Sequence, residues 1–396
     1  MSASANPDIV DDGLVFLYDT DDGKSYKGEP TTNVIAGTNL INTVGGTYTT
    51  NTTVDGVRIL ENNQVNNSHV MWNGATGFIV TCSAGAYVTV SAEYKTNCTI
   101  RMRFRDNPYD SQYDIDGGNI ATISEQSVDI DTNGEWKRYS LTAQTSTANP
   151  DLWWYIADYR SNNEFGRVEI RNWQVEVKSH ATPFVNGTRS ATQGLIDRTG
   201  NSTIDLSDVS FDSNAQMAFD GTDDYALTTF TPSADDNKTI SVWVNFDILT
   251  GSYSYVVGLD YSNSTDGFIP ISVASYNGNW VLRMRQQLGT LGTNLVVYSN
   301  LTINTGEWIN LVISSNGSAF NFYKNGVKGS AVSGTNNGRW FSILNEPIMI
   351  GASDWLTNQL LSTTDGKIAN VSIYNKQLTD AEVLQNYNAT KSRFNL

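Results

Sequence analysis

The residues with the clearest potential for chemistry are aromatic side chains in a short run of alternating residue types. On an extended strand Trp153 and Tyr155 share one face, whereas Leu152 and Ile156 lie on the other. Because the aliphatic pair marks the face that packs into a core, we expect Trp153 and Tyr155 to be exposed. Sugar rings stack on flat aromatic faces, so this pattern indicates a carbohydrate-binding surface.

Arginines alternate with apolar residues in a second stretch. Met102 and Phe104 are expected to face the core. This leaves three arginines exposed, where they can donate hydrogen bonds to sugar hydroxyls: Arg101, Arg103 and Arg105. A structural alternative stays open, in which the aromatic residues cover a sheet and the arginines neutralise the acidic loop at 106–116.

The second half of the chain holds a comparable set of tryptophans and arginines, and it is a second candidate for glycan binding: Trp280, Arg283, Arg285 and Trp340. Calcium is the only cofactor that the residue types suggest, because it prefers hard oxygen ligands. The candidate calcium ligands are Asp220, Asp223 and Asp224, with the 106–116 loop as another acidic stretch. Neither has EF-hand spacing, and a solvated acidic turn is the alternative for both.

Composition and charge exclude several classes of protein. A net charge of −16 and a pI near 4.5 argue against nucleic-acid binding. No apolar run approaches the roughly 18 residues of a membrane span, so we expect no membrane insertion. The first residues lack the features of a secretory signal, which predicts synthesis and retention in the cytosol. There we expect Cys82 and Cys98 to be buried thiols, with a disulfide as the alternative.

Period-two alternation of apolar and polar residues recurs along the whole chain. Examples are 87–94, 99–105 and 239–246, and glycine and asparagine turns separate such runs. Glu135-Trp136 in the first half is echoed by Glu307-Trp308 in the second. We therefore predict an all-β protein with two antiparallel jelly-roll sandwiches. A single short helix is expected near the C-terminus, where Thr379 and Glu382 form a capping box before the apolar stripe of Val383, Leu384 and Tyr387.

The second half resembles the laminin-G-like, concanavalin A-type jelly roll. The resemblance covers residues 196–396 and rests on 217–225, 239–244, 306–308, 322–327, 348–351, 366–369 and 378–387. Residues 13–19 look like the first strand of this family, and 195–201 look like the segment that follows it. The intervening sandwich is then an insertion, and the expected division is 1–35, 36–187 and 188–396.

Residues 36–187 look like a carbohydrate-binding-module jelly roll of the kind found in bacteriophage structural and tail proteins. The matching pieces are 88–94, 134–136, 171–176 and 181–184. Glucanases of the concanavalin A type carry a Glu-x-Asp-x-x-Glu strand motif, which this sequence lacks. The chain has only two histidines, neither of which suggests a triad, and no cysteine–histidine cluster has zinc spacing. We therefore expect no enzymatic activity.

These observations lead to three hypotheses of function, and the third is a glycoside hydrolase or lyase, which the missing glucanase motif argues against. In the first, the chain is a bacteriophage virion protein made in the host cytoplasm: a capsid decoration, a head fibre or a tail component on the virion surface. Its partners would be other capsid or tail proteins, further copies of itself in a homo-oligomer, and host-surface or mucus glycans. In the second, it is a free carbohydrate-binding, lectin-like protein or the binding part of a polysaccharide-degrading enzyme.

Overall fold

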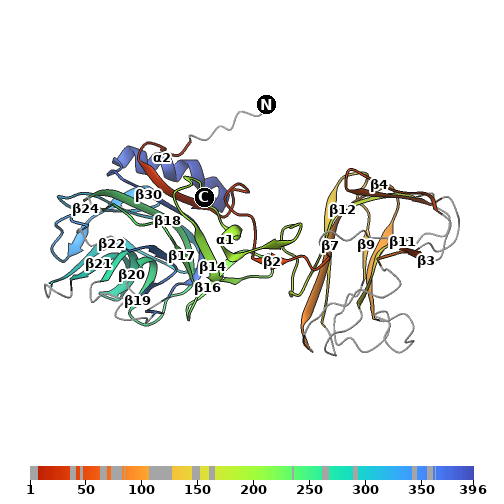
Figure 1. The fold of residues 1–396 in the computed structure, drawn as a ribbon. Coiled ribbons are helices and arrows are strands. Elements are labelled where there is room, and N and C mark those ends of the chain that lie inside the picture. Colours follow the sequence, from red (N-terminus) through yellow and green to blue (C-terminus); the bar gives the residue numbers. More distant parts are fainter. Residues whose placement is uncertain are drawn as a thin grey trace. The chain divides into compact units, whose positions relative to one another are not determined.

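The computed structural model describes residues 8–35, 42–44, 48–62, 69–72, 83, 85–106, 127–144, 152–159, 166–233, 236–260, 267–288, 293–340, 346–354, 360–361 and 363–396. These residues are mostly in antiparallel strands, which confirms the predicted all-β class. The chain divides into two compact units (Figure 1). One unit contains Met1–Pro30, Ser190–Asp212 and Gln216–Leu396, and the other contains Thr31–Arg189 with Ser213–Ala215.

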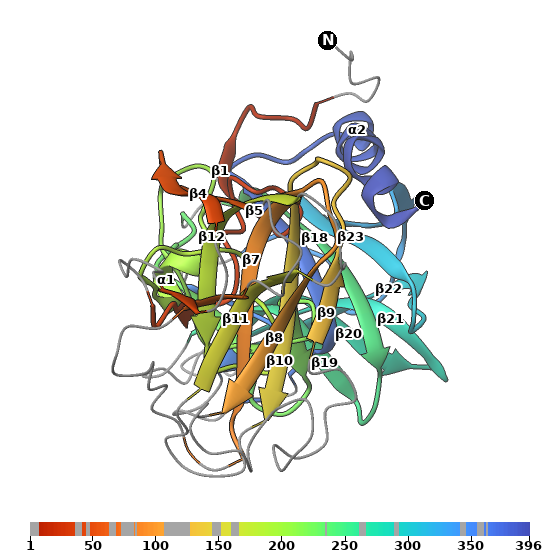
Figure 2. The same cartoon turned by 90° about the vertical axis from the view of Figure 1, so that its right-hand side faces the viewer.

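The unit that starts at Thr31 has two five-stranded antiparallel sheets among its described residues (Figure 2). One has the order β10 (Lys137–Gln144), β7 (Tyr87–Thr96), β12 (Gly166–Glu176), β5 (Val57–Asn62) and β4 (Tyr48–Val54). The other has the order β3 (Asn42–Val44), β6 (His69–Trp72), β11 (Leu152–Tyr159), β8 (Ile100–Asp106) and β9 (Ser127–Ile130). The core draws on both sheets, with Val88 and Val90 from β7 and Met102 from β8, all 0% exposed. Cys98 is buried as well, whereas Cys82 lies outside the described residues.

The chain enters and leaves this unit through a pair of short strands. β2 (Thr31–Thr32) and β13 (Thr188–Arg189) are antiparallel, with Thr32 opposite Thr188. The two threonine Oγ1 atoms lie 3.1 Å apart. An insertion whose ends meet in this way is compatible with a continuous fold on either side of it.

The larger unit is a sandwich of two sheets with eight described strands each. The first sheet has the order β15 (Ser210–Phe211), β16 (Met217–Asp220), β30 (Asp365–Tyr374), β18 (Asn237–Ile248), β23 (Trp308–Asn316), β24 (Phe320–Lys324) and β25 (Val327–Gly329), and β1 (Leu14–Asp19) also pairs with β30. The second has the order β14 (Ile204–Asp208), β17 (Tyr225–Thr228), β27 (Ile348–Ile350), β19 (Tyr253–Leu259), β20 (Gly267–Tyr276), β21 (Asn279–Leu288), β22 (Thr293–Thr302) and β26 (Ala331–Ser333). A small separate ladder joins β28 (Ser353–Asp354) to β29 (Leu360–Leu361).

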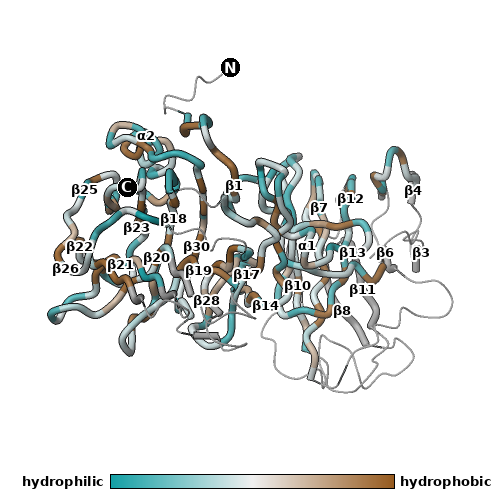
Figure 3. The backbone as a smooth tube through the Cα atoms, turned by 60° about the vertical axis from the view of Figure 1, so that its left-hand side comes forward, coloured by the Kyte–Doolittle hydropathy of each residue, from teal (hydrophilic) through white to brown (hydrophobic). Residues whose placement is uncertain are grey.

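Alternation along β18 explains how the first sheet forms one side of the core. Ile240, Val242 and Val244 point into the hydrophobic core shared with the second sheet. Trp243 lies on the opposite face, where its ring stacks on Tyr387 with 5.7 Å between centroids. The hydrophobic stretches of these strands are visible in Figure 3.

The first strand of the chain belongs to this larger sandwich. Tyr18 of β1 lies opposite Val371 of β30, and Phe16 and Tyr18 are both 0% exposed in its core. The segment that follows the insertion lies beside β1, because the backbone N–H of Arg198 donates to the carbonyl of Leu17 at 2.7 Å. The strand order thus joins residues on both sides of the insertion into one sandwich.

Helical structure is sparse among the described residues: α1 (Ala191–Gly194), α2 (Asp380–Thr390) and the 3₁₀ turn η2 (Lys391–Phe394). The predicted capping box of α2 is confirmed, since Thr379 Oγ1 accepts from the Glu382 N–H at 3.2 Å and the Glu382 carboxylate accepts from the Thr379 N–H at 2.8 Å. Val383 is buried as predicted, whereas Leu384 is 45% exposed, so the predicted stripe is narrower than expected. None of the described helices is long and apolar enough to cross a membrane.

Candidate functional site

The strand register of the inserted unit brings its predicted aromatic and arginine positions together. β11 is antiparallel to β8, with Trp153 opposite Arg105 and Tyr155 opposite Arg103. Arg101 lies opposite Asp158, beyond a shift in register. The side chains of these residues fall outside what the structure describes, so their contact with a glycan stays a prediction.

The tryptophans predicted in the larger unit lie on the core side of its second sheet. Trp340 is 0% exposed and packs edge-on against Phe320, with 5.1 Å between ring centroids. Trp280 is partly buried against the same core. The prediction that Trp340 stacks on a sugar is therefore corrected: its faces are covered by the sandwich interior.

The arginines of the same set lie on the other side of the sheet. Leu282 and Met284 are core residues, so the alternation of β21 turns Arg283 and Arg285 outward. Four neighbouring strands each contribute one residue to a continuous row on this face. The row runs across β19, β20, β21 and β22 in the order Tyr255, Ser272, Arg283 and Tyr298.

Arg283 is the centre of this row and is almost fully covered. It is 1% exposed, and its Nε donates to Ser272 Oγ at 3.1 Å. The guanidinium carbon lies 4.2 Å from the ring centroid of Tyr253 and 5.6 Å from that of Tyr255. Its Nη2 finds no acceptor among the residues that the structure describes. Aromatic faces thus hold the cation, since the ring quadrupole attracts positive charge.

Tyrosines surround the arginines, and sequence reasoning missed them. Tyr253 is 37% exposed and stacks on Tyr255 at 6.3 Å, while Tyr276 stacks on Tyr298 at 4.6 Å. The alternation of Tyr253 and Tyr255 in one strand was the available signal. We call this surface the β19–β22 face and define it by Tyr253, Tyr255, Tyr276, Arg283, Arg285 and Tyr298.

Arg285 provides the more accessible cation of the β19–β22 face. It is half-buried, and burial lowers the pKa of its guanidinium, an effect that a hydrogen bond with Tyr255 opposes. An arginine keeps its charge under such a shift because its reference pKa is far above neutral. The face therefore combines flat rings with N–H donors, the two elements that bind a sugar's apolar side and its hydroxyls.

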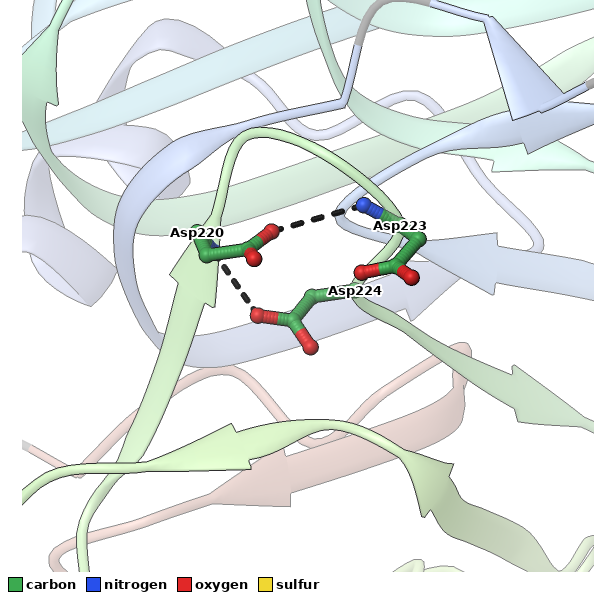
Figure 4. A group of neighbouring side chains, drawn as sticks. All are labelled: Asp220, Asp223 and Asp224. Atoms are coloured by element: carbon green, nitrogen blue, oxygen red, sulfur yellow. Dashed lines mark hydrogen bonds between the residues drawn. The ribbon is translucent and has the colours of Figure 1, made fainter.

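The predicted calcium ligands do come together. Side-chain oxygens of Asp220, Asp223 and Asp224 lie within 4.8 Å of one another (Figure 4). Both oxygens of Asp224 also accept backbone hydrogen bonds, from Ser210 at 3.0 Å and Asp220 at 2.7 Å. Burial raises the pKa of the Asp224 carboxyl, and the charge of Asp220 adds to the effect. Backbone hydrogen bonds thus stabilise the turn without a ligand, and its carboxylates also suit a hard cation. A solvated acidic turn and a calcium site therefore both stay open as interpretations.

Comparison with known families supports the concanavalin A-type resemblance. Residues 220–384 match the family model described as the concanavalin A-like lectin/glucanases superfamily. The C-terminal half therefore contains a concanavalin A-like jelly roll. No curated protein matches the sequence significantly.

Solved structures resemble the chain at low identity. A heptameric SAP-like pentraxin from Limulus polyphemus is 16% identical over 42% of this chain and 78% of its own, with a TM-score of 0.33. Domain 4 of AbnA, a GH43 extracellular arabinanase from Geobacillus stearothermophilus solved with arabinotriose, is 21% identical over 50% of this chain and 93% of its own, with a TM-score of 0.33. The CBM40 of the Ruminococcus gnavus IT-sialidase is 11% identical over 38% of this chain and 82% of its own, also with a TM-score of 0.33. Likenesses at this level assign no ligand to this chain.

Proposed function

We propose that this chain is a lectin-like carbohydrate-binding protein whose β19–β22 face contacts the glycan. One observation carries the proposal: stacked tyrosines and outward arginines occupy adjacent strands of one sheet in a concanavalin A-like sandwich. Such a face offers a sugar both a flat apolar platform and charged hydrogen-bond donors.

The members of the face have different roles in this proposal. Tyr253 is the platform, because its ring is the exposed one, at 37%. Arg285 donates to hydroxyl or carboxylate oxygens of the ligand. Arg283 is buried and acts as a positioning residue, because its guanidinium lies 4.2 Å from the Tyr253 ring centroid and fixes the ring's orientation.

The inserted unit supplies a second surface under the same proposal. Its cross-strand pairs, Trp153 with Arg105 and Tyr155 with Arg103, have the same composition of rings and arginines. Two weak surfaces on one chain raise the avidity for a repeating polysaccharide when both can bind at once. Neither surface requires an acid–base pair, so we propose binding without turnover.

The virion-surface role stays a prediction that rests on the resemblance of the inserted unit to phage modules. So do its capsid or tail partners and its homo-oligomeric state. Mass spectrometry of purified particles tests this role directly, because a virion component is present in many copies.

The binding proposal is tested by a glycan array with the full chain, followed by titration of the best glycan into variants. We expect Tyr253→Ala and Arg285→Ala each to weaken binding about tenfold or more, which corresponds to at least about 1.4 kcal/mol. Tyr87→Ala and Arg339→Ala are matched controls, since Tyr87 is 42% exposed on the other unit and Arg339 is exposed and is not one of the residues that define the face. Full affinity in Tyr253→Ala and Arg285→Ala would refute the assignment of this face.

A further inference from the structure

A pocket lies on the other sheet of the larger sandwich, away from the β19–β22 face. Its volume is about 460 Å³, which falls in the usual range for small-ligand sites. The floor is a row across three adjacent strands, because Asn245 of β18 lies opposite both Lys367 of β30 and Trp308 of β23. These positions belong to the outer face of the sheet, since their neighbours Val244 and Ile309 are core residues.

Segments that are distant in the sequence form the walls. The 3₁₀ turn at the C-terminal end contributes Phe394, whose ring lies 4.7 Å from that of Trp308 between centroids. The turn after β1 contributes Thr20 and Asp21. The pocket therefore exists only when β1, β18, β23, β30 and the C-terminal turn are assembled. Phe394 in the wall and Trp308 in the floor give the pocket an apolar surface for a ring-shaped ligand.

Carboxylates outnumber cations around the pocket. Lys367 donates to Asp212 at 2.6 Å, and Arg393 pairs with Asp19 and lies 3.7 Å from Asp21. Asp247 adds a further carboxylate to the lining. Because carboxylates already engage the two cations, a phosphate or carboxylate ligand gains little here. This excess of carboxylates favours an uncharged polar ligand over an anionic one.

The side chain of Asn245 gives the strongest indication that a ligand with a hydrogen-bond donor binds in this pocket. Its Oδ1 is buried, and no described residue donates a hydrogen bond to it. A buried acceptor without a donor costs about 1–3 kcal/mol. A rotation of the Asn245 side chain that turns this oxygen toward the pocket would let a ligand hydroxyl donate to it and recover that cost.

We propose that this pocket is a second binding site, which takes a neutral polyhydroxylated ring such as the terminal residue of a saccharide. Its ring packs against Trp308 and Phe394, and one hydroxyl donates to Asn245. The ligand class deepens the proposed carbohydrate-binding function, but the site shares no residue with the β19–β22 face.

The experiment uses the full chain and ¹H–¹⁵N spectra of its tryptophan indoles, with the Trp308 signal assigned from a Trp308→Phe variant. The probes are the methyl glycosides of glucose, galactose, mannose and N-acetylglucosamine, and glucuronate as the charged comparison. We expect at least one neutral glycoside to shift the Trp308 indole. Asn245→Ala should weaken that binding about fivefold or more, whereas Tyr253→Ala should leave it unchanged.

Three results would refute the proposal that this pocket binds a neutral sugar. They are an unmoved Trp308 signal with every glycoside, equal affinity in Asn245→Ala, and a response to glucuronate alone. The wild-type spectrum decides the first and third even if a variant fails to fold. Loss of array binding in Tyr253→Ala with an unmoved Trp308 signal would refute this pocket alone. A shifted Trp308 signal with full array binding in Tyr253→Ala would refute the assignment of glycan binding to the β19–β22 face alone.

Discussion

At the scale of single residues, the contacts of Arg283 indicate whether the β19–β22 face serves packing or ligand binding. Its guanidinium is buried, and one of its nitrogens finds no acceptor within the described part of the chain, yet it lies against the most exposed ring of the β19–β22 face. A cation that is costly to bury and contacts a surface ring is more easily explained by ligand recognition than by stability.

We predict that Arg283→Met weakens glycan binding at least fivefold while changing the free energy of unfolding by less than about 1 kcal/mol. The lost cation–π contact is offset by removal of a buried N–H that has no acceptor among the described residues. Arg283→Lys should restore part of the affinity, since a lysine keeps a cation near Tyr253. Denaturant titration and calorimetric binding measure the two quantities. Parallel losses of stability and affinity, without rescue by lysine, would assign Arg283 a structural role only.

Residue-level prediction from the sequence is possible where a single strand decides the outcome. Such prediction could have used the alternation of Leu282 and Met284, which turns Arg283 and Arg285 to the outer face. It failed for Trp340, which follows a glycine- and asparagine-rich stretch and whose burial depends on Phe320 from another strand. Tyr298 was missed because its place beside Arg283 arises only from the pairing of β21 with β22.

At the scale of elements, the C-terminal helix is held by its cap and by one tryptophan. The Trp243 indole donates to Thr390 Oγ1 at 2.9 Å, and Phe394 stacks on the same ring at 4.3 Å. The helix thus covers the outer face of β18 and positions the turn that forms one wall of the pocket. The cap was predictable from Thr379 and Glu382, whereas the stacking on Trp243 depends on the sheet.

Glu382 gives this helix a predictable pH dependence. Hydrogen bonds from the Thr379 backbone and from Lys376 hold the pKa of the Glu382 carboxyl below its reference of 4.5. Its contribution to stability is therefore complete above the unfolded pKa and is lost as the pH falls through the folded pKa. We expect Glu382→Gln to be less stable than wild type at pH 7, with a difference that shrinks below pH 4.5.

Denaturant unfolding at several pH values measures this difference, with Glu135→Gln in an exposed turn as the control. A difference between Glu382→Gln and wild type that stays constant down to pH 3, well below the reference pKa of 4.5, would contradict the capping role. Thr379→Ala should independently cost about 1 kcal/mol, the usual value for loss of an N-cap side chain.

At the scale of the whole molecule, one sandwich is built from chain segments on both sides of another. β1 pairs with β30, and β2 pairs with β13 where the chain enters and leaves the inserted unit. The sequence contained this topology only as a resemblance of 13–19 and 195–201 to consecutive family segments. Periodicity alone could not reveal it, because strand alternation says nothing about which distant strand is the neighbour.

We predict that replacing residues 31–189 with a short glycine–serine linker leaves the larger unit folded, because both ends of the insertion meet in one strand pair and closure of a short loop costs little. Calorimetry should show a single transition for this variant. Adding Phe16→Ala to it should then cost about 3–5 kcal/mol, since that ring is 0% exposed in the core. An unfolded deletion variant, or an unaffected Phe16→Ala, would contradict the continuity of the sandwich across the insertion.

Binding of a glycan by the β19–β22 face is best decided by the structure of a complex. The full chain is crystallised with the tightest glycan from the array. We expect a sugar ring packed on Tyr253 with a hydrogen bond from Arg285. A glycan bound with both residues untouched would contradict it.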